Sequence, residues 1–228
     1  MTDRSVTAIA LSGQFGSGVS TVGAGLARRL GFDLFDDKLV RQIAGRAHTS
    51  LEAADLYNRM PAGRMHALVS LLGWPVEVVS RAEELPSAER HVERSIVDAT
   101  DSLIRGLAER GRAIICGRGG AWILSRGRLV LRVHLVGDED GRRCLVAEGD
   151  DRLGSFGSVA AEDPRNLIRR VDRSRASYVR QFHGGDVDRA SAYDLTVDSV
   201  NLGWAATVTL IEQAAGLGAA DRSGANSG

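Results

Sequence analysis

A glycine-rich turn between an apolar run and a helical pattern constrains this chain more than any other stretch. Residues 6–11 are apolar and suit a β-strand, and residues 13–18 read Gly-Gln-Phe-Gly-Ser-Gly. Val22, Leu26 and Leu30 then recur at the spacing of one helical face. Glycines at such a turn let backbone N–H groups converge on an anion, and the following helix directs its positive end to the same point. The order of strand, glycine loop and helix therefore predicts a phosphate-binding site.

The loop matches the phosphate-binding consensus G-x-x-x-x-G-K-[ST] at every fixed position but one. Gly13, Gly18 and Ser20 fit, whereas Val19 stands where the consensus has lysine. A lysine there normally reaches the β- and γ-phosphates, and valine has no donor for them. The amide cradle remains, together with a hydroxyl on Ser20 or Thr21 that can bind Mg²⁺. The alternative is an ordinary glycine turn between a strand and a helix.

Length and composition indicate one medium-sized domain, or one domain with an inserted subdomain. The chain has 228 residues, and its 29 basic side chains balance its 29 acidic ones. Zero net charge argues against a general nucleic-acid or membrane binder. The first apolar run is too short to span a membrane and follows Asp3, so no signal peptide is expected. Cys116 and Cys144 lack metal-type or redox spacing, which favours two buried thiols in a reduced, cytoplasmic setting.

Five stretches have the apolar pattern of strands, and helical patterns separate them. They are residues 6–11, 32–35, 112–116, 129–136 and 193–197. Alternation of strands and helices is typical of an α/β fold with helices on both faces of a parallel sheet. The sequence therefore predicts a five-stranded parallel sheet within a single domain over residues 1–216. We also expect a helical insertion at 45–90, a lid region at 149–182 and a disordered tail at 217–228.

Polar residues follow two of the predicted strands. Asp36 and Asp37 come directly after residues 32–35, where they serve either as the cap of the next helix or as ligands of a substrate or metal. Arg118 lies in a glycine turn directly after residues 112–116. Ligands of open parallel sheets bind at the carboxyl ends of the strands. Arg118 is therefore expected in that crevice, where its guanidinium can hold a phosphate, and a surface arginine is the alternative.

The most basic segment of the chain is a helix expected from residue 161. Its arginines are Arg165, Arg169, Arg170, Arg173, Arg175 and Arg180, with Asp172 and Tyr178 among them. Such a concentration of positive charge in a neutral protein, after a glycine-rich segment, favours a lid over phosphates, although a solvated helix has a similar pattern. His134 lies within an apolar strand and is expected to be a core or edge histidine.

Several of these stretches together resemble the cytidylate-kinase-like P-loop proteins, a branch of the nucleoside monophosphate kinase fold. The similar pieces follow the family's order and are residues 13–18, 35–40, 115–119, 171–178 and 193–195. The resemblance implies a core domain with a lid and a nucleotide-binding insertion. It also implies transfer of the γ-phosphoryl group of ATP to CMP or dCMP, in a branch that often lacks the P-loop lysine. The expected cofactors are ATP and Mg²⁺, and the expected assembly is a cytoplasmic monomer or homodimer.

The same resemblance implies roles for individual residues. The phosphates of ATP are expected at Gly13, Phe15, Gly16, Ser17, Gly18, Val19, Ser20 and Thr21, with Ser20 as the Mg²⁺ ligand. The acceptor nucleotide is expected at Asp37, Arg41 and Arg118. Arg173 and Arg175 are expected to close over the transferred group, with Asp172 orienting both. Arg118, Asp172, Arg173 and Arg175 are thus the expected catalytic residues.

Val19 keeps other functions open. A protein that binds nucleotides without catalysing transfer is one alternative, because the missing lysine favours it. A kinase for another small acceptor is a second, with the helical insertion setting the choice of acceptor. A structural protein whose glycine loop binds nothing is a third, and the arginine cluster and the position of Arg118 argue against it.

Overall fold

The chain folds around one parallel sheet of five strands. A computed structural model describes residues 6–36, 87–117, 119–124, 129–147 and 163–220. The strands are β1 (Ala8–Gly13), β2 (Asp33–Phe35), β3 (Ala113–Cys116), β4 (Val130–Val136) and β5 (Leu195–Asp198). They pair in the order β2-β3-β1-β4-β5, and every pairing is parallel. The predicted sheet is confirmed, whereas insertion residues 45–86 and lid residues 149–162 lie outside the described residues.

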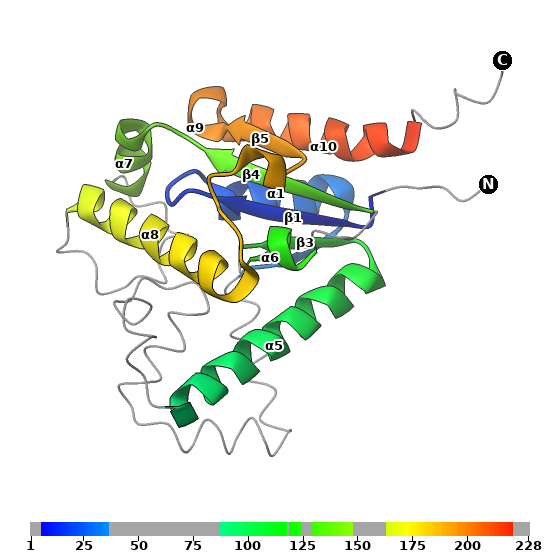
Figure 1. Cartoon of the computed structure of the whole chain (residues 1–228). Helices are drawn as coiled ribbons and strands as arrows, with labels where there is room; N and C mark the ends of the chain where they lie inside the picture. Colours follow the sequence, from blue (N-terminus) through cyan, green and yellow to red (C-terminus); the bar gives the residue numbers. More distant parts are fainter. Residues whose placement is uncertain (1–5, 37–86, 118, 125–128, 148–162, 221–228) are drawn as a thin grey trace.

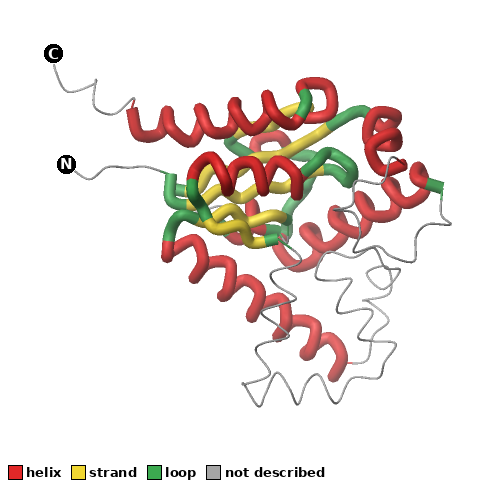
Figure 2. The backbone as a smooth tube through the Cα atoms, turned by 180° about the vertical axis from the view of Figure 1, so that it is seen from behind, coloured by secondary structure: helices red, strands yellow, loops and turns green. Residues whose placement is uncertain are grey.

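Helices cover both faces of this sheet. Helix α1 (Val19–Leu30) and helix α10 (Trp204–Ala220) pack on one face, while α5 (Ser87–Arg110) and α6 (Gly120–Ile123) pack on the other. Figure 1 shows α10 above the sheet and α5 below it, and Figure 2 shows the same layers from behind. The layering follows from alternation along β1, because successive side chains of a strand point to opposite faces. Ile9 and Leu11 enter the first layer, and Ala8 and Ala10 enter the second.

Three more helices lie at the carboxyl end of the sheet. They are α7 (Glu139–Ala147), α8 (Pro164–His183) and α9 (Ser199–Leu202). Asp163 caps α8 by accepting the Arg165 N–H, and Pro164 occupies its first turn, where proline is favoured. In Figure 1, α7 and α8 lie beside the glycine loop at the left end of β1. The predicted arginine-rich segment is therefore a regular helix from Pro164 onward.

Gly203, with φ 82°, separates α9 from α10. Two details differ from the sequence-based expectations. Helix α10 continues to Ala220, into the segment predicted to be a tail. Cys144 is exposed, so the prediction of two buried thiols is wrong for it. Its helix buries Arg142, and a residue two positions later points to nearly the opposite side.

Candidate active site

The glycine loop joins the end of β1 to the start of α1. Gly16 has φ 85° and Gly18 has φ 82°, a left-handed conformation that glycine adopts without strain. A Cβ atom on Gly18 would overlap the indole ring of Trp204, and a Cβ on Gly16 would lie 3.0 Å from the carbonyl oxygen of Arg142. Both glycines are thus required by conformation and by space, and Gly18 is one of the fixed positions of the motif.

Four N–H groups of the loop are available to a ligand. Among the described residues, no acceptor is bound to the backbone N–H of Gly16, Gly18, Val19 or Ser20. The Phe15 N–H instead donates to Asp172 Oδ1 at 2.8 Å. The four available groups precede or begin the 12-residue helix α1, whose amino end favours negative charge. This arrangement suits a phosphate group.

Two serines of the loop have different roles. The Ser17 hydroxyl is buried and donates to the Gln14 carbonyl oxygen at 2.7 Å, so it stabilises the turn itself. Ser20 is exposed on the first turn of α1. Of these two hydroxyl groups, Ser20 is therefore the one open to a metal ion.

The carbonyl groups of the loop are bound from outside by three helices. Each bond comes from a different side chain: Arg175 Nη1 to Gly13 O at 2.8 Å, Arg142 Nη1 to Phe15 O at 2.9 Å, and Ser199 Oγ to Ser17 O at 2.7 Å. These side chains belong to α8, α7 and α9. The loop conformation is thus fixed by residues that follow it by more than a hundred positions.

Arg142 and Asp172 form a largely buried ion pair behind the loop. Arg142 Nη1 lies 2.7 Å from Asp172 Oδ2, and the Arg142 side chain is 7% exposed. Arg142 Nε also donates to Gly137 O at 3.0 Å. Arg142 was not among the predicted site residues, although its position after the carboxyl end of the central strand β4 was a signal for it.

The predicted arginines of α8 occupy different surroundings. The Arg175 guanidinium lies at Gly13 and 5.9 Å from the centre of the Phe15 ring. Arg173 is exposed and its Nε donates to Arg169 O in the same helix. Asp172 was expected to orient Arg173 and Arg175, but its carboxylate binds Arg142 and the Phe15 N–H. That expectation is corrected, because α8 turns Asp172 toward the loop.

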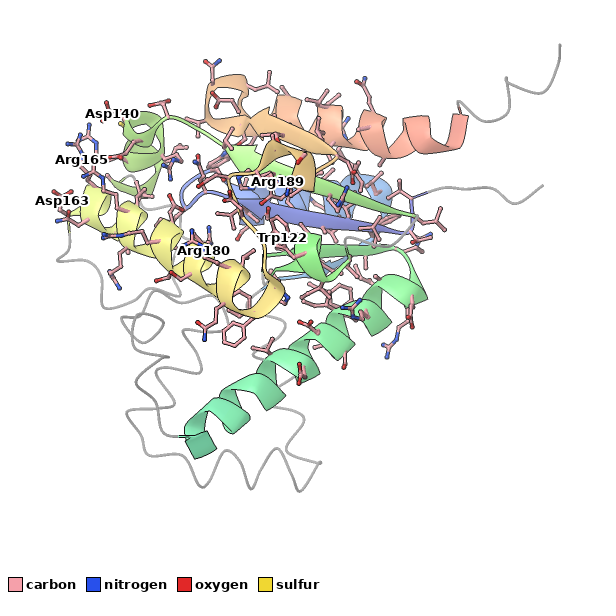
Figure 3. The ribbon with its side chains drawn as sticks, in the orientation of Figure 1. Trp122, Asp140, Asp163, Arg165, Arg180 and Arg189 are labelled. Atoms are coloured by element: carbon pink, nitrogen blue, oxygen red, sulfur yellow. The ribbon has the colours of Figure 1, made fainter. Side chains whose placement is uncertain are left out.

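Other arginines of the basic segment pair with acids on α7. Arg165 Nη2 lies 3.4 Å from Asp140 Oδ1, and Arg169 Nη2 lies 3.0 Å from Glu139 Oε1. Figure 3 shows Arg165 and Asp140 side by side where the two helices meet, while Arg180 lies farther along α8. These exposed pairs are weak individually. Together with Leu167, Ile168 and Val171, which enclose the buried Phe15 ring, they join α8 to α7 and the loop.

A neutral histidine lies beneath the loop. His134 Nδ1 is 3.0 Å from the hydroxyl of Ser12, which directly precedes Gly13, and the imidazole stacks on Tyr193 with 4.4 Å between ring centres. Burial is the main cause that lowers the pKa of His134 to about 4, so it is uncharged at neutral pH. The expectation of a core histidine is confirmed. Burial also raises the pKa of Tyr193, whose hydroxyl donates to Val187 O.

The acceptor side of the predicted site is described only in part. Asp37, Arg41 and Arg118 lie outside the described residues. Asp36 follows β2, and Gly117 follows β3, so the chain segments that lead to these residues do reach the carboxyl edge of the sheet. Within the described residues, no helix is long and apolar enough to cross a bilayer.

Comparisons with known proteins agree with this arrangement. Residues 8–201 match the model of the Cytidylate kinase-like family. A cytidylate kinase of Natronomonas pharaonis is 25% identical over 194 residues, which are 85% of this chain and 81% of that protein. The crystal structure of an uncharacterized protein from Eubacterium ventriosum superposes with a TM-score of 0.58 at 18% identity, over 90% of this chain and 98% of the other. The structural likeness concerns the fold alone.

Proposed function

The chain belongs to the cytidylate kinase-like family, and on that premise we propose that it transfers the γ-phosphoryl group of ATP to a nucleoside monophosphate, CMP or dCMP. The observation that carries the proposal is the glycine loop, which has four available N–H groups and binds the Arg175 guanidinium at Gly13 O. The choice of a cytidine nucleotide is supported by the family and by the relative called cytidylate kinase.

The donor nucleotide binds at the glycine loop. The N–H groups of Gly16, Gly18, Val19 and Ser20 hold its β-phosphate, with the amino end of α1 adding positive potential. The exposed Ser20 hydroxyl is the protein ligand for Mg²⁺, which when bound neutralises charge on the phosphates. The remaining predicted positions of the loop contribute its shape and no proposed bond to the nucleotide; they are Gly13, Phe15, Ser17 and Thr21.

Arg175 takes over the charge that a lysine at position 19 would supply. Its Nη1 donates to the carbonyl oxygen of Gly13, the first residue of the motif, so the cation already lies at the loop. A guanidinium has several donors in one plane and can bind a phosphoryl oxygen while keeping a bond to the backbone. Arg173, which is exposed on the same helix, is a second and weaker candidate.

Phosphoryl transfer requires positioning and positive charge rather than acid–base chemistry from the protein. The attacking atom is an oxygen of the acceptor phosphate, which is already ionised at neutral pH. A general base is therefore unnecessary, consistent with a buried and neutral His134 beneath the loop. Arg118 and Arg41 are proposed to hold the acceptor phosphate, and Asp37 is proposed to contact the acceptor nucleoside.

A coupled ADP-release assay tests this function. Purified protein receives Mg-ATP with CMP, dCMP, UMP, AMP, GMP or no acceptor. Release that depends on CMP or dCMP is the expected result. ADP release that depends on a different nucleotide would mean that the chain is a kinase with another acceptor. If Mg-ATP raises the melting temperature of the protein but no ADP is released, the chain is better described as a nucleotide-binding protein without transfer activity, the alternative that Val19 favours.

A further inference from the structure

We propose that Arg142, together with Asp172, is a positioning residue that aims the Gly16 N–H at the bound phosphate, and that Ser199 does the same for the Gly18 N–H. This inference rests on the proposed function. Three side chains outside the consensus loop would thus determine how well the loop binds an anion.

The geometry begins with a closed set of hydrogen bonds around Phe15. Arg142 Nη1 donates both to Phe15 O at 2.9 Å and to Asp172 Oδ2 at 2.7 Å. Asp172 Oδ1 accepts the Phe15 N–H at 2.8 Å. One ion pair thus binds the donor and the acceptor of a single loop residue, and the backbone at Phe15 is held on both sides.

A peptide unit transmits this constraint to the next residue. The C=O of one residue and the N–H of the next share a rigid trans plane and point in opposite directions. Because Arg142 draws the Phe15 C=O toward α7, the Gly16 N–H points away from α7, and it has no acceptor among the described residues. The bond from Ser199 Oγ to Ser17 O directs the Gly18 N–H in the same manner.

Glycine makes such external fixing necessary. A residue without Cβ populates positive and negative φ about equally, so the peptides that flank Gly16 and Gly18 can rotate at little cost. A rotated Phe15–Gly16 peptide would present a carbonyl oxygen to the phosphate in place of a donor. Bonds from a buried side chain remove that alternative before the nucleotide binds, which is the preorganisation that phosphate sites require.

Arg142 acts through the loop and not on the nucleotide. Its side chain is 7% exposed, and among the described residues its hydrogen bonds go to Gly137, Phe15 and Asp172. Ser199 is fully buried and bonds Ser17 O and Val136 O. Neither side chain therefore has to touch ATP to change its affinity.

The test compares Arg142→Met, Arg142→Lys and Ser199→Ala with Arg132→Met, a change in another arginine–aspartate pair. Each protein is labelled with ¹⁵N-glycine and titrated with Mg-ADP, so that the amide signals of Gly16 and Gly18 report the loop directly. In the wild type, both signals should shift on saturation. In Arg142→Met the Gly16 shift should fall by at least half while the Gly18 shift persists, and Ser199→Ala should show the reverse.

Affinity gives the second measurement. The dissociation constant of Mg-ADP should rise roughly 10- to 100-fold in Arg142→Met, because one donor to a charged phosphate is lost. Arg142→Lys, which keeps a donor for Phe15 O, should recover part of the loss, and Arg132→Met should bind as the wild type does. Folding of each variant is checked by its thermal melt.

Three results would overturn the inference. They are a wild-type Gly16 shift in folded Arg142→Met, an equal loss of affinity in Arg132→Met, and a wild-type chain that does not bind Mg-ADP. The last would also remove the proposed function, whereas Mg-ADP binding without phosphoryl transfer would remove only the function and leave the positioning roles supported by the amide shifts.

Discussion

Two arginine–aspartate pairs in this molecule use the same chemistry at opposite edges of the sheet. Arg132 Nη2 lies 2.6 Å from Asp194 Oδ1, and Arg142 Nη1 lies 2.7 Å from Asp172 Oδ2. In each pair the aspartate also accepts a backbone N–H, that of Arg132 in the first and that of Phe15 in the second. The pairs differ in what that N–H belongs to, a strand in one case and the glycine loop in the other.

The first pair is therefore expected to contribute to the stability of the sheet, and the second to the proposed function of the loop. The first pair ties β4 to the residue before β5 and is partly exposed, with 21% and 37% of the two side chains accessible. The second is more buried and fixes a loop that has no regular secondary structure of its own. An identical interaction therefore aligns strands at the amino edge and shapes the glycine loop, the proposed phosphate site, at the carboxyl edge.

The largest effect is expected at Arg175, which donates to Gly13 O at the carboxyl edge. Arg175→Ala should lower turnover about 10³-fold, because an arginine that acts on the transferred phosphoryl group contributes on that scale. Arg173→Ala should have a smaller effect, since its side chain is exposed and bonded to its own helix. Initial rates at saturating ATP and acceptor measure both. If the turnover of Arg175→Ala stays within tenfold of wild type, the carboxyl edge of the sheet does not have the functional role that the comparison gives it.

The next effect concerns His134, which lies in β4 between the two pairs. Its pKa is about 4 in the folded chain and about 6.5 when unfolded, so the unfolded chain binds more protons in that window. Stability should therefore be full above pH 6.5 and fall by about 3 kcal/mol as the pH approaches 4. Urea unfolding from pH 7 to pH 4 measures the slope, which should be shallower in His134→Gln. An unchanged slope in that variant would contradict the assignment.

A third test contrasts glycines of the loop and of a helix. Gly18→Ala places a Cβ against Trp204 at a residue with φ 82°, and the strain should destabilise the fold by about 1–3 kcal/mol. Gly106→Ala in α5 meets no atom within 4 Å and should stabilise by about 0.5–1 kcal/mol, since alanine favours a helix. Thermal melts distinguish the two signs. Equal shifts would mean that the loop conformation is wrong.

The smallest effect is expected at Asp194. Arg132 donates hydrogen bonds that lower the pKa of Asp194 in the folded chain. The ionised carboxylate therefore stabilises the fold at pH values above the pKa of an unfolded aspartate, and this contribution is lost as the pH falls through the lower pKa of the folded chain. Asp194→Asn should reduce the free energy of unfolding at pH 7 by less than about 1 kcal/mol, because the pair is partly exposed. Turnover should stay within twofold of wild type. A large loss of turnover in Asp194→Asn would mean that the amino edge of the sheet also serves the function and not only the stability of the fold.

Local patterns in the sequence were sufficient to predict much of the fold and the glycine loop. Short apolar runs predicted the strands, and the spacing from Gly13 to Gly18 predicted the turn, because both depend on neighbours in the chain. The arginine-rich segment was predicted to be a lid over phosphates; the structure places Arg175 of this segment at Gly13, and the lid itself stays a prediction. These inferences needed no knowledge of distant contacts.

The supports of the loop could not be predicted in the same way. Phe15 lies 127 residues before Arg142 and 157 before Asp172, so no spacing rule connects them. Asp172 was expected to orient Arg173 and Arg175. The adjacent Arg173 does not share its helical face, whereas Arg175, three positions on, does and also reaches the loop. The Asp172 carboxylate nevertheless binds the Phe15 N–H and Arg142, two partners that are distant in the sequence. Ser199 likewise gained its role only through the packing of α9 against the loop.

Transfer of labelled phosphate tests the central claim most directly, namely that this chain moves a phosphoryl group without a loop lysine. Enzyme in excess is mixed with γ-labelled ATP, Mg²⁺ and CMP, and the products are separated by chromatography. The label is expected to appear in CDP, and Arg175→Ala is expected to slow its appearance. Label that remains in ATP, or that is released only as inorganic phosphate, would contradict this claim.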